Sequence, residues 1–302
     1  MIRKRISAVL LMMTIASVLI MGSAMPADAA GNKYDLPSKA QEYYKETDED
    51  GNIVSDEWKT GATETFKYNK KGHLVNYKKK YTDGATETET VKWTYKKGKI
   101  SKCVTNFTYK NGNNTDKRKY VALYKKGRLT EETVIDKYED GTTGKSASKY
   151  FYNKKGWINK RTYRIKNENA ANNIKMTYYK NGMPKTMSLN VPGFGSMSGY
   201  RWKFDFNNKG LLNTEYLITA FDGKKDIVTG SYVYEYDDKG RVKTVYRMDD
   251  TNKSIDYGWK LEYEYGNSGT SDRRVYFGIM NKTYASLITG HDVVPGPFYF
   301  MR

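Results

Sequence analysis

Apolar and polar residues alternate with a period of two along much of the chain. The alternation is clearest over residues 91–95, 200–206, 232–236 and 257–265, where aromatic residues take every second place. Successive side chains of an extended strand point to opposite faces, so the pattern predicts antiparallel strands with one buried aromatic face and one charged face. Helix-like patterning is confined to two short candidates, residues 38–45 and 281–289.

A short phrase recurs between these strands: an aromatic residue, then Asn, Asp or Lys, then Gly. Its seven copies end, at intervals of 26 to 30 residues, at Gly72, Gly98, Gly127, Gly156, Gly182, Gly210 and Gly240. An apolar residue usually stands two places after each glycine, with Pro184 as the exception. The aromatic residue is expected to end a strand, the glycine to take a positive φ in a tight turn, and the apolar residue to begin the return strand.

A second turn signal falls between successive phrases. It stands at Asp83–Gly84, Asn111–Gly112, Asp140–Gly141, Pro192–Gly193 and Asp222–Gly223. Two turns in each repeat mean two strands in each repeat, and short turns make sequential strands neighbours. The sequence therefore predicts an all-β fold, an antiparallel up-and-down meander of about 14–17 strands built from 26–30-residue β-hairpin repeats. A sheet of that size is expected to be rolled or flattened into a barrel-like form.

The two ends of the chain differ from this repeat. Residues 1–30 combine a basic start, an apolar run over 8–21 and small residues at 24–30, which is typical of a signal peptide. We expect residues 31–61 to form an N-terminal cap and first hairpin, 62–274 the β-hairpin repeat domain, and 275–302 a C-terminal cap or tail. A second long apolar run is missing from the sequence, so the mature chain is expected to be secreted or cell-wall-associated without a membrane span.

The amino-acid composition limits the kinds of reactive or metal-binding site that the chain can form. The 302 residues include 52 Lys and Arg against 34 Asp and Glu, giving a formal charge of +18, with 28 Tyr, one Cys and two His. A single cysteine excludes an internal disulfide framework and a cysteine-based zinc site, and two distant histidines argue against a Ser-His-Asp triad. We therefore expect no enzyme activity and no cofactor. Cys103 is expected to be buried and inert, with a reactive thiol as the alternative.

The segment Tyr234–Val242, reading YEYDDKGRV, resembles the YD repeat of Rhs-type and teneurin-like surface proteins. That family pattern is an aromatic-rich strand, Asp, a spacer, Gly-Arg and an apolar residue. The likeness extends in divergent form over residues 68–266, about two thirds of the chain, with Gly127–Leu129 as a second match and Gly182–Pro184 as a departure. It implies an array of β-hairpins on an exported bacterial surface protein, and it carries over no catalytic residue.

Lysine clusters in and beside the repeat turns are the main candidate binding residues. They are Lys70, Lys71, Lys96, Lys97, Lys125, Lys126, Lys154 and Lys155. Equivalent turns of a repeat stack along one edge, where their summed field would attract a cell-wall polyanion or an anionic glycan. The alternative is a solvated surface whose lysines protect the edges of the sheet. Nucleic acid is an unlikely partner because the sequence contains no recognised nucleic-acid-binding module.

Residues 46–57 offer a possible metal site. Counting Gly51 as the sixth position of a calcium loop places Glu46, Asp48, Asp50 and Glu57 at the first, third, fifth and twelfth positions. The alternative is an ordinary hairpin turn, because the flanking residues are poor helix formers and position one is Glu rather than Asp. No metal site is predicted on this basis alone.

These observations predict a secreted, non-catalytic repeat protein of the cell envelope that binds a polyanionic or glycan surface component. Two alternatives remain open at this point. One is a secreted carbohydrate-active enzyme, because carboxylates paired in space are invisible in a sequence. The other is an outer-membrane-type β-barrel, because strands of about ten alternating residues fit that class. The direction in which the aromatic face points would separate the barrel alternative from the main interpretation.

Overall fold

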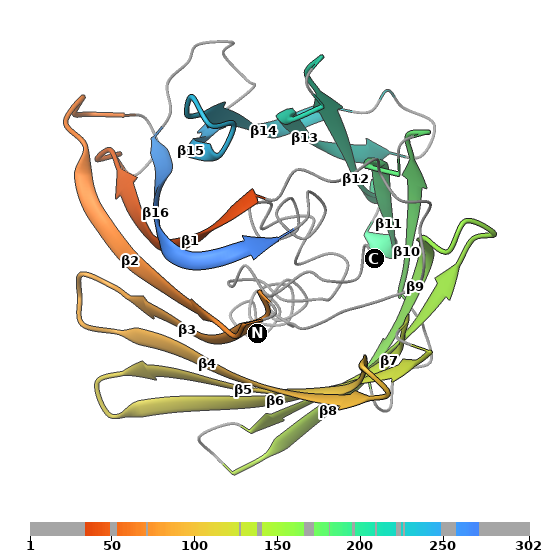
Figure 1. Ribbon diagram of the computed structural model, residues 1–302. Helices are drawn as coiled ribbons and strands as arrows, with labels where there is room; N and C mark the ends of the chain where they lie inside the picture. Colours follow the sequence, from red (N-terminus) through yellow and green to blue (C-terminus); the bar gives the residue numbers. More distant parts are fainter. Residues whose placement is uncertain are drawn as a thin grey trace.

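The computed structural model describes residues 34–48, 53–70, 72–126, 128–137, 141–165, 172–180, 182–194, 197–208, 210–221, 225, 227–248 and 258–271. In these residues sixteen antiparallel strands follow one another, each hydrogen-bonded to the next in sequence. The first strand pairs with the last, so the meander is a closed barrel, and Figure 1 looks into it. This confirms the predicted all-β meander of 14–17 strands and its barrel-like form.

The strands span from seven to thirteen residues. They are β1 (Tyr34–Tyr44), β2 (Lys59–Tyr68), β3 (Leu74–Lys80), β4 (Thr86–Lys96), β5 (Lys99–Asn111), β6 (Asn114–Lys125), β7 (Arg128–Lys137), β8 (Thr143–Tyr152), β9 (Ile158–Ile165), β10 (Asn172–Tyr178), β11 (Pro184–Phe194), β12 (Met197–Phe206), β13 (Leu212–Phe221), β14 (Ile227–Tyr236), β15 (Val242–Met248) and β16 (Trp259–Ser271). An aromatic residue of the repeat phrase ends β2, β8, β12 and β14, as the sequence predicts, whereas β10 ends at Tyr178, one residue before the Tyr179 of its phrase.

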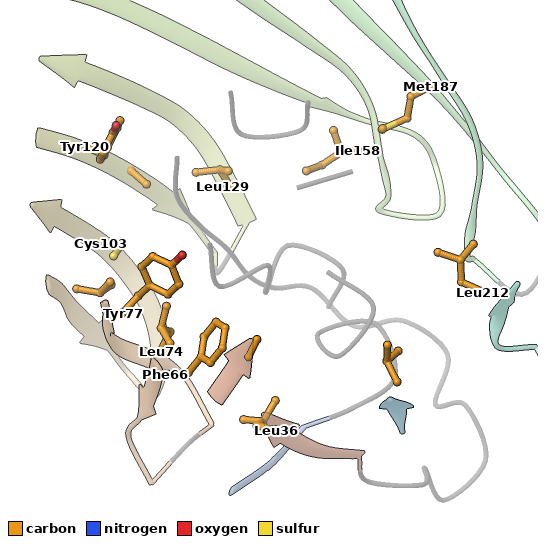
Figure 2. Close-up of a cluster of buried hydrophobic side chains, with 14 of the residues drawn as sticks. Leu36, Phe66, Leu74, Tyr77, Cys103, Tyr120, Leu129, Ile158, Met187 and Leu212 are labelled. Carbon is orange, nitrogen blue, oxygen red and sulfur yellow. The ribbon is translucent and has the colours of Figure 1, made fainter. Parts of the chain in front are cut away.

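Alternation along each strand separates an inner face from an outer one. The inner face supplies the buried core, which includes Phe66, Tyr77, Tyr120 and Phe204, all less than 5 % exposed. Figure 2 shows Leu74 and Tyr77 on one wall and Met187 and Leu212 on the opposite wall, pointing toward the space between them. The predicted aromatic face is therefore the inner face, and the lysine-bearing face is the outer one.

The seam between β1 and β16 is held by backbone pairing and by side chains. The two strands pair from Tyr34↔Ser271 to Tyr44↔Trp259. Lys39 forms an ion pair with Glu264 at 2.6 Å, and Trp259 Nε1 donates a hydrogen bond to Glu42 Oε1 at 2.6 Å. Closure removes the two exposed strand edges that an open sheet would present to other chains.

Two local expectations were wrong. Residues 38–45, a helix candidate, lie almost wholly in β1, because the backbone there pairs with both β2 and β16 and Ala40 is fully buried. Tertiary pairing outweighs the favourable helix propensities of Ala, Gln and Glu, because propensity decides little when the backbone has strand partners on both sides. The turn expected at Pro192–Gly193 lies inside β11, which continues to Phe194 after an irregularity in its register with β12. The signal peptide over 1–30, the tail over 275–302 and the helix candidate at 281–289 fall outside the described residues.

Candidate functional site

The repeat turns all lie at one end of the barrel. Consecutive connections of an up-and-down barrel alternate between its two ends, so the turns after β2, β4, β6, β8, β10, β12 and β14 share one end. These turns carry the repeat glycines, and we call this end the Gly-turn rim. The described repeat glycines have φ between 69° and 82°, as predicted for the turn, while Gly127 lies outside the described residues.

The Gly-turn rim is strongly basic. Its described turns and adjoining strand ends carry Lys70, Lys96, Lys97, Lys99, Lys125, Lys126, Arg128, Lys154, Lys155, Lys180, Lys239 and Arg241. The acids in the same described segments are Asp237 and Asp238, and Asp35 near the start of β1 pairs with Arg241 at 3.0 Å. The structure thus brings together seven of the eight predicted lysines, all of them exposed, while Lys71 is outside the described residues.

The opposite end is close to neutral. Its described connections and adjoining strand ends carry the acids Glu46, Asp48, Asp56, Glu57 and Asp83 and the cations Lys45, Lys59, Lys80, Lys137 and Lys225. Part of this charge is neutralised locally, because Lys45 Nζ pairs with Asp56 Oδ1 at 2.9 Å and Lys59 pairs with Glu46. The barrel is therefore electrically asymmetric along its axis, and a field of this kind orients an approaching polyanion toward the rim.

Two lysines of the rim stand in a backbone conformation that lysine disfavours. Lys97 has φ 49° beside Gly98 with φ 74°, and Lys126 has φ 54°. Positive φ at the two central residues of a two-residue hairpin is the geometry for which Asn-Gly is preferred. A lysine there costs about 1 kcal/mol relative to a residue that tolerates this region.

Like charges also face each other across the strands at this end. Lys96 is the register partner of Lys99, and Lys125 is the register partner of Arg128. Directly opposed like charges destabilise a sheet. The rim therefore keeps its positive charge at a cost to stability, which a merely soluble surface has no need to do.

The longer turns are closed by an Asn or Asp side chain. Asn153 Oδ1 accepts hydrogen bonds from the backbone N–H groups of Lys155 and Trp157, both at 3.0 Å. Asp237 does the same for Lys239 and Arg241, and it also pairs with the Arg241 guanidinium at 2.6 Å. Burial alone would raise the pKa of Asp237, but the Arg241 N–H, its guanidinium and the Lys239 N–H together lower it.

Aromatic rings below the turns support some of the rim cations. The Arg128 guanidinium lies 5.4 Å from the centroid of the Tyr152 ring, and Lys155 Nζ lies 4.9 Å from that of Trp157. The Arg241 guanidinium lies 4.4 Å from the Tyr265 ring centroid. Cation–π contacts of this length restrict the long side chains, so less conformational entropy is lost when they meet an anion.

Sequence reasoning missed a set of hydrogen bonds that joins neighbouring hairpins. The repeat tyrosine donates its hydroxyl to the backbone carbonyl of the apolar residue two places after the previous glycine. The pairs are Tyr152 to Leu129 (2.7 Å), Tyr178 to Ile158 (2.5 Å), Tyr236 to Leu212 (2.6 Å) and Tyr265 to Val242 (2.8 Å). The constant place of both residues in the phrase was the available signal. These bonds fix the spacing of the turns around the rim.

Sequence reasoning also missed a group of buried charges on the inner face. Glu64, Lys79 and Glu87 are register partners on β2, β3 and β4, and Lys79 Nζ lies 3.1 Å from Glu42 Oε2 and 3.8 Å from Glu64 Oε1. Burial alone would lower the pKa of Lys79, but the Glu64 and Glu42 carboxylates outweigh this effect and raise it. A buried, mutually paired group of this kind is a structural device of the core.

A second buried carboxyl lies in the middle of the inner face. Glu132 is 1 % exposed, and Tyr150 donates its hydroxyl to Glu132 Oε2 at 3.1 Å. Burial raises the pKa of Glu132 well above its usual range, although Arg161 and the Tyr150 hydroxyl oppose the shift. Cys103 is also fully buried, as expected, and burial raises the pKa of its thiol.

The outer face of the strands carries exposed lysines between the two ends of the barrel. Lys92, Lys102, Lys117, Lys119 and Lys149 are all exposed there. A lysine facing lipid at the middle of a bilayer costs about 2–4 kcal/mol. The closed barrel is thus the architecture of the outer-membrane alternative, whereas the outer face differs from the apolar band that such a barrel presents to lipid. No helix among the described residues has the length and apolar character needed to cross a membrane.

The calcium-loop candidate lies at the end opposite the Gly-turn rim and has the form of a hairpin connection. Thr47 and Ile53 form an antiparallel bridge, and Val54 N–H donates to the Glu46 carbonyl at 2.9 Å. The Glu57 backbone N–H donates to Ser55 Oγ, and Asp50 lies outside the described residues. Across the described ranges, no three His, Cys, Asp or Glu side chains are grouped so that they could hold a metal ion.

Comparisons with known proteins find no matching family model and no matching curated protein. Several solved structures are similar to the chain. A porin-like protein from Bacteroides uniformis is 14 % identical, covers 76 % of this chain and 98 % of its own, and has a TM-score of 0.43. A porin-like protein from Bacteroides vulgatus is 11 % identical, covers 63 % and 100 %, and has a TM-score of 0.35. The Tc holotoxin pore of Photorhabdus luminescens is 11 % identical over 72 % of this chain and 14 % of its own, with a TM-score of 0.27.

Proposed function

We propose that this chain is a non-catalytic protein of the cell envelope that binds a polyanion through the Gly-turn rim. The observation that carries the proposal is the collection of the repeat lysines at one end of a closed barrel, whereas acids and cations balance among the described residues of the other end. Charge on a single rim gives a polyanion many simultaneous contacts, each of which releases counterions. Export to the cell surface and the kinship with YD-repeat proteins belong to the same proposal.

The energetics of the rim support binding over mere solubility. Lysine occupies positive-φ positions at Lys97 and Lys126, and cations oppose each other at Lys96↔Lys99. A surface selected for solubility alone would mix signs and avoid these costs. An anionic ligand relieves the repulsion, because it lies between the cations and screens them from one another.

The proposal does not include catalysis, because the acidic side chains of the inner face are buried. Glu64 and Glu132, described above, are at 0 % and 1 % exposure, and Glu89 on β4 is at 0 %. A glycoside hydrolase needs two carboxyl groups that flank a substrate bond. Acids that water barely reaches are poor candidates for that role, so a carbohydrate-active enzyme is the weaker hypothesis.

The test is co-sedimentation of the mature protein with purified cell walls, intact or stripped of anionic polymer, across a salt series. A rim variant carries Lys70→Gln, Lys96→Gln, Lys125→Gln and Lys154→Gln. A control variant carries Lys78→Gln, Lys80→Gln, Arg201→Gln and Lys225→Gln, which are exposed and away from the rim. Both variants lose the same net charge. We expect the rim variant to lose binding to intact walls at least tenfold and the control to stay within about twofold.

Two results would count against the proposal. Equal loss in both variants would assign the binding to net charge alone. Unchanged binding of the rim variant to stripped walls at high salt would instead favour recognition of the glycan by aromatic side chains.

A membrane-spanning barrel is the second candidate, favoured by the closed sheet of sixteen strands in the described residues, a strand number found in porins. Flotation with liposomes tests it. We expect the protein to stay in the aqueous fraction because lysines are exposed along the outer face of the strands. Stable insertion that resists carbonate washing would establish the second candidate and make the Gly-turn rim the mouth of a pore.

A further inference from the structure

The outer face of five adjacent strands carries a second basic surface, separate from the turns. The outward residues of β5 to β9 include Lys102, Lys117, Lys119, Lys137, Lys145, Lys149, Lys160 and Arg164, which we call the cationic wall. Among the described outward residues of these strands the one acid is Glu131, and its register partner is Lys149. The remaining cations of the wall have no acid as a direct cross-strand partner in the described register.

The register places these cations close together. Lys117 and Lys137 are direct cross-strand partners, so their Cα atoms lie about 5 Å apart. Lys119 follows Lys117 on the same face at about 7 Å, twice the rise of one strand residue. Lys119 and Lys145 both pair with Ile135, one from each side. The wall is thus a closely spaced array of positive charges. In the absence of a ligand, the direct opposition of Lys117 and Lys137 destabilises the sheet.

The wall is continuous with the Gly-turn rim. β6 runs from Lys117 on the wall to Lys125 at the rim, a distance of about 27 Å for eight residues of extended strand. Lys102 is likewise three residues from the rim residue Lys99 on β5. A ligand that binds the rim therefore meets further cations without a break when it passes over the edge of the barrel.

We infer that the cationic wall and the Gly-turn rim form one continuous track for a linear, flexible anionic polymer, an inference that rests on the proposed function. The rim faces along the barrel axis and the wall faces sideways. A flat anionic membrane can contact one of them at a time, whereas a flexible chain can bend over the edge and contact both. Recognition is by charge, because the described wall presents one exposed aromatic ring, Phe151, with Lys160 Nζ 5.7 Å from its centroid, whereas base stacking along a strand uses a succession of rings.

The inference predicts that affinity depends on ligand length. The probes are linear inorganic polyphosphates, one with an extended length below about 27 Å and one several times longer. A wall variant carries Lys102→Gln, Lys117→Gln, Lys119→Gln and Lys145→Gln. We expect it to lose at least tenfold affinity for the long probe and less than twofold for the short one. Its salt slope for the long probe should fall by about 3, because each lost contact contributes about 0.7–0.9.

The rim variant and the control variant defined above complete the design. The rim variant should weaken the binding of both probes, and the control variant that of neither. If the wall variant binds the long probe as wild type does, the continuous track is wrong, while the rim result still decides the proposed function. If the rim variant binds both probes as the wild type does, the proposed function is wrong, whatever the wall variant shows.

The third probe is a single-stranded DNA that matches the long polyphosphate in length and charge. It should bind no more tightly than the long polyphosphate. A preference of tenfold or more for the DNA would identify the wall as a nucleic-acid surface and overturn the inference. Thermal unfolding of each variant checks that the fold is intact.

Discussion

The hydroxyl of Tyr236, at the end of β14, donates a hydrogen bond of 2.6 Å to the backbone carbonyl of Leu212, at the start of β13. The same pair of places in the phrase is joined at Tyr152 and Leu129. Because each bond links one hairpin to the previous one, it holds successive rim turns in register. The geometry of the binding surface therefore depends on residues that never touch a ligand.

Removing this hydroxyl should loosen the rim. We expect Tyr236→Phe to lower the free energy of unfolding by about 1–2 kcal/mol, since the Leu212 carbonyl is left without its partner. Urea unfolding measures the change. Tyr216→Phe is the matched control, because that ring contacts Lys203 on the outer face and the contact survives in phenylalanine. Equal effects of the two variants would contradict a special role for the Tyr236 hydroxyl.

At the two positive-φ lysines, stability and polyanion binding should favour different residues. Asn accepts this backbone region, so Lys97→Asn and Lys126→Asn should each raise the free energy of unfolding by about 1 kcal/mol. Each should also weaken polyanion binding and reduce the salt slope by about 0.7–0.9. Lys97→Gln separates the two effects, because it removes the charge without relieving the backbone. A Lys97→Asn protein that binds as tightly as wild type would remove Lys97 from the site.

The buried carboxyl of Glu132 should make stability depend on pH. Its pKa is raised in the folded state, so its contribution is complete below the unfolded value of about 4.3. That contribution is lost as the pH rises through the folded pKa, at about 1.4 kcal/mol for each pH unit. Arg161, Tyr150 and Cys103 are the titratable neighbours. Glu132→Gln should remove this loss, and urea unfolding from about pH 4 to pH 9 compares the two proteins. Parallel curves would refute the assignment.

Asp237 should show the opposite dependence. Its pKa is lowered in the folded protein, so its contribution is present above the unfolded value and is lost as the pH falls through the folded one. Asp237→Ala removes the bonds to the backbone of Lys239 and Arg241 and should lower the free energy of unfolding by about 1–2 kcal/mol at neutral pH. The neighbouring Asp238→Ala, an exposed position, should have little effect. A similar loss in both variants would mean that the turn needs local negative charge rather than the cap.

Much of the architecture could be predicted from the chain because the signals are local. The phrase from Tyr236 to Gly240 marks a strand end and a turn, and alternation marks the buried face. Prediction failed where distant pairing decides the outcome. Residues 38–45 contain good helix formers, yet partners on both sides make them part of β1. The turn signal at Pro192–Gly193 lies inside β11, where the register with β12 is irregular, and the two strands pair again at Phe194↔Met197 just beyond it.

The candidate site likewise has features that could be predicted from the sequence and features that could not. The rim lysines could be found from the repeat itself, since equivalent turns gather at one end of any meander. The cationic wall could not, because it depends on which strands are neighbours and in what register, as with Lys117 and Lys137. The buried acids had a signal that was overlooked. Glu87 and Glu89 share the parity of Val91 and Trp93 along β4, which places them on the inner face.

The seam between β1 and β16 has a consequence for how the chain is made. Tyr44 pairs with Trp259, and Lys39 with Glu264, more than two hundred positions later. Among the described strands β1 is made first and pairs with β16, which is made last, so the barrel can close only after all sixteen strands are present. Contacts between residues so far apart in the sequence slow folding, and closure is therefore expected to be the slow step.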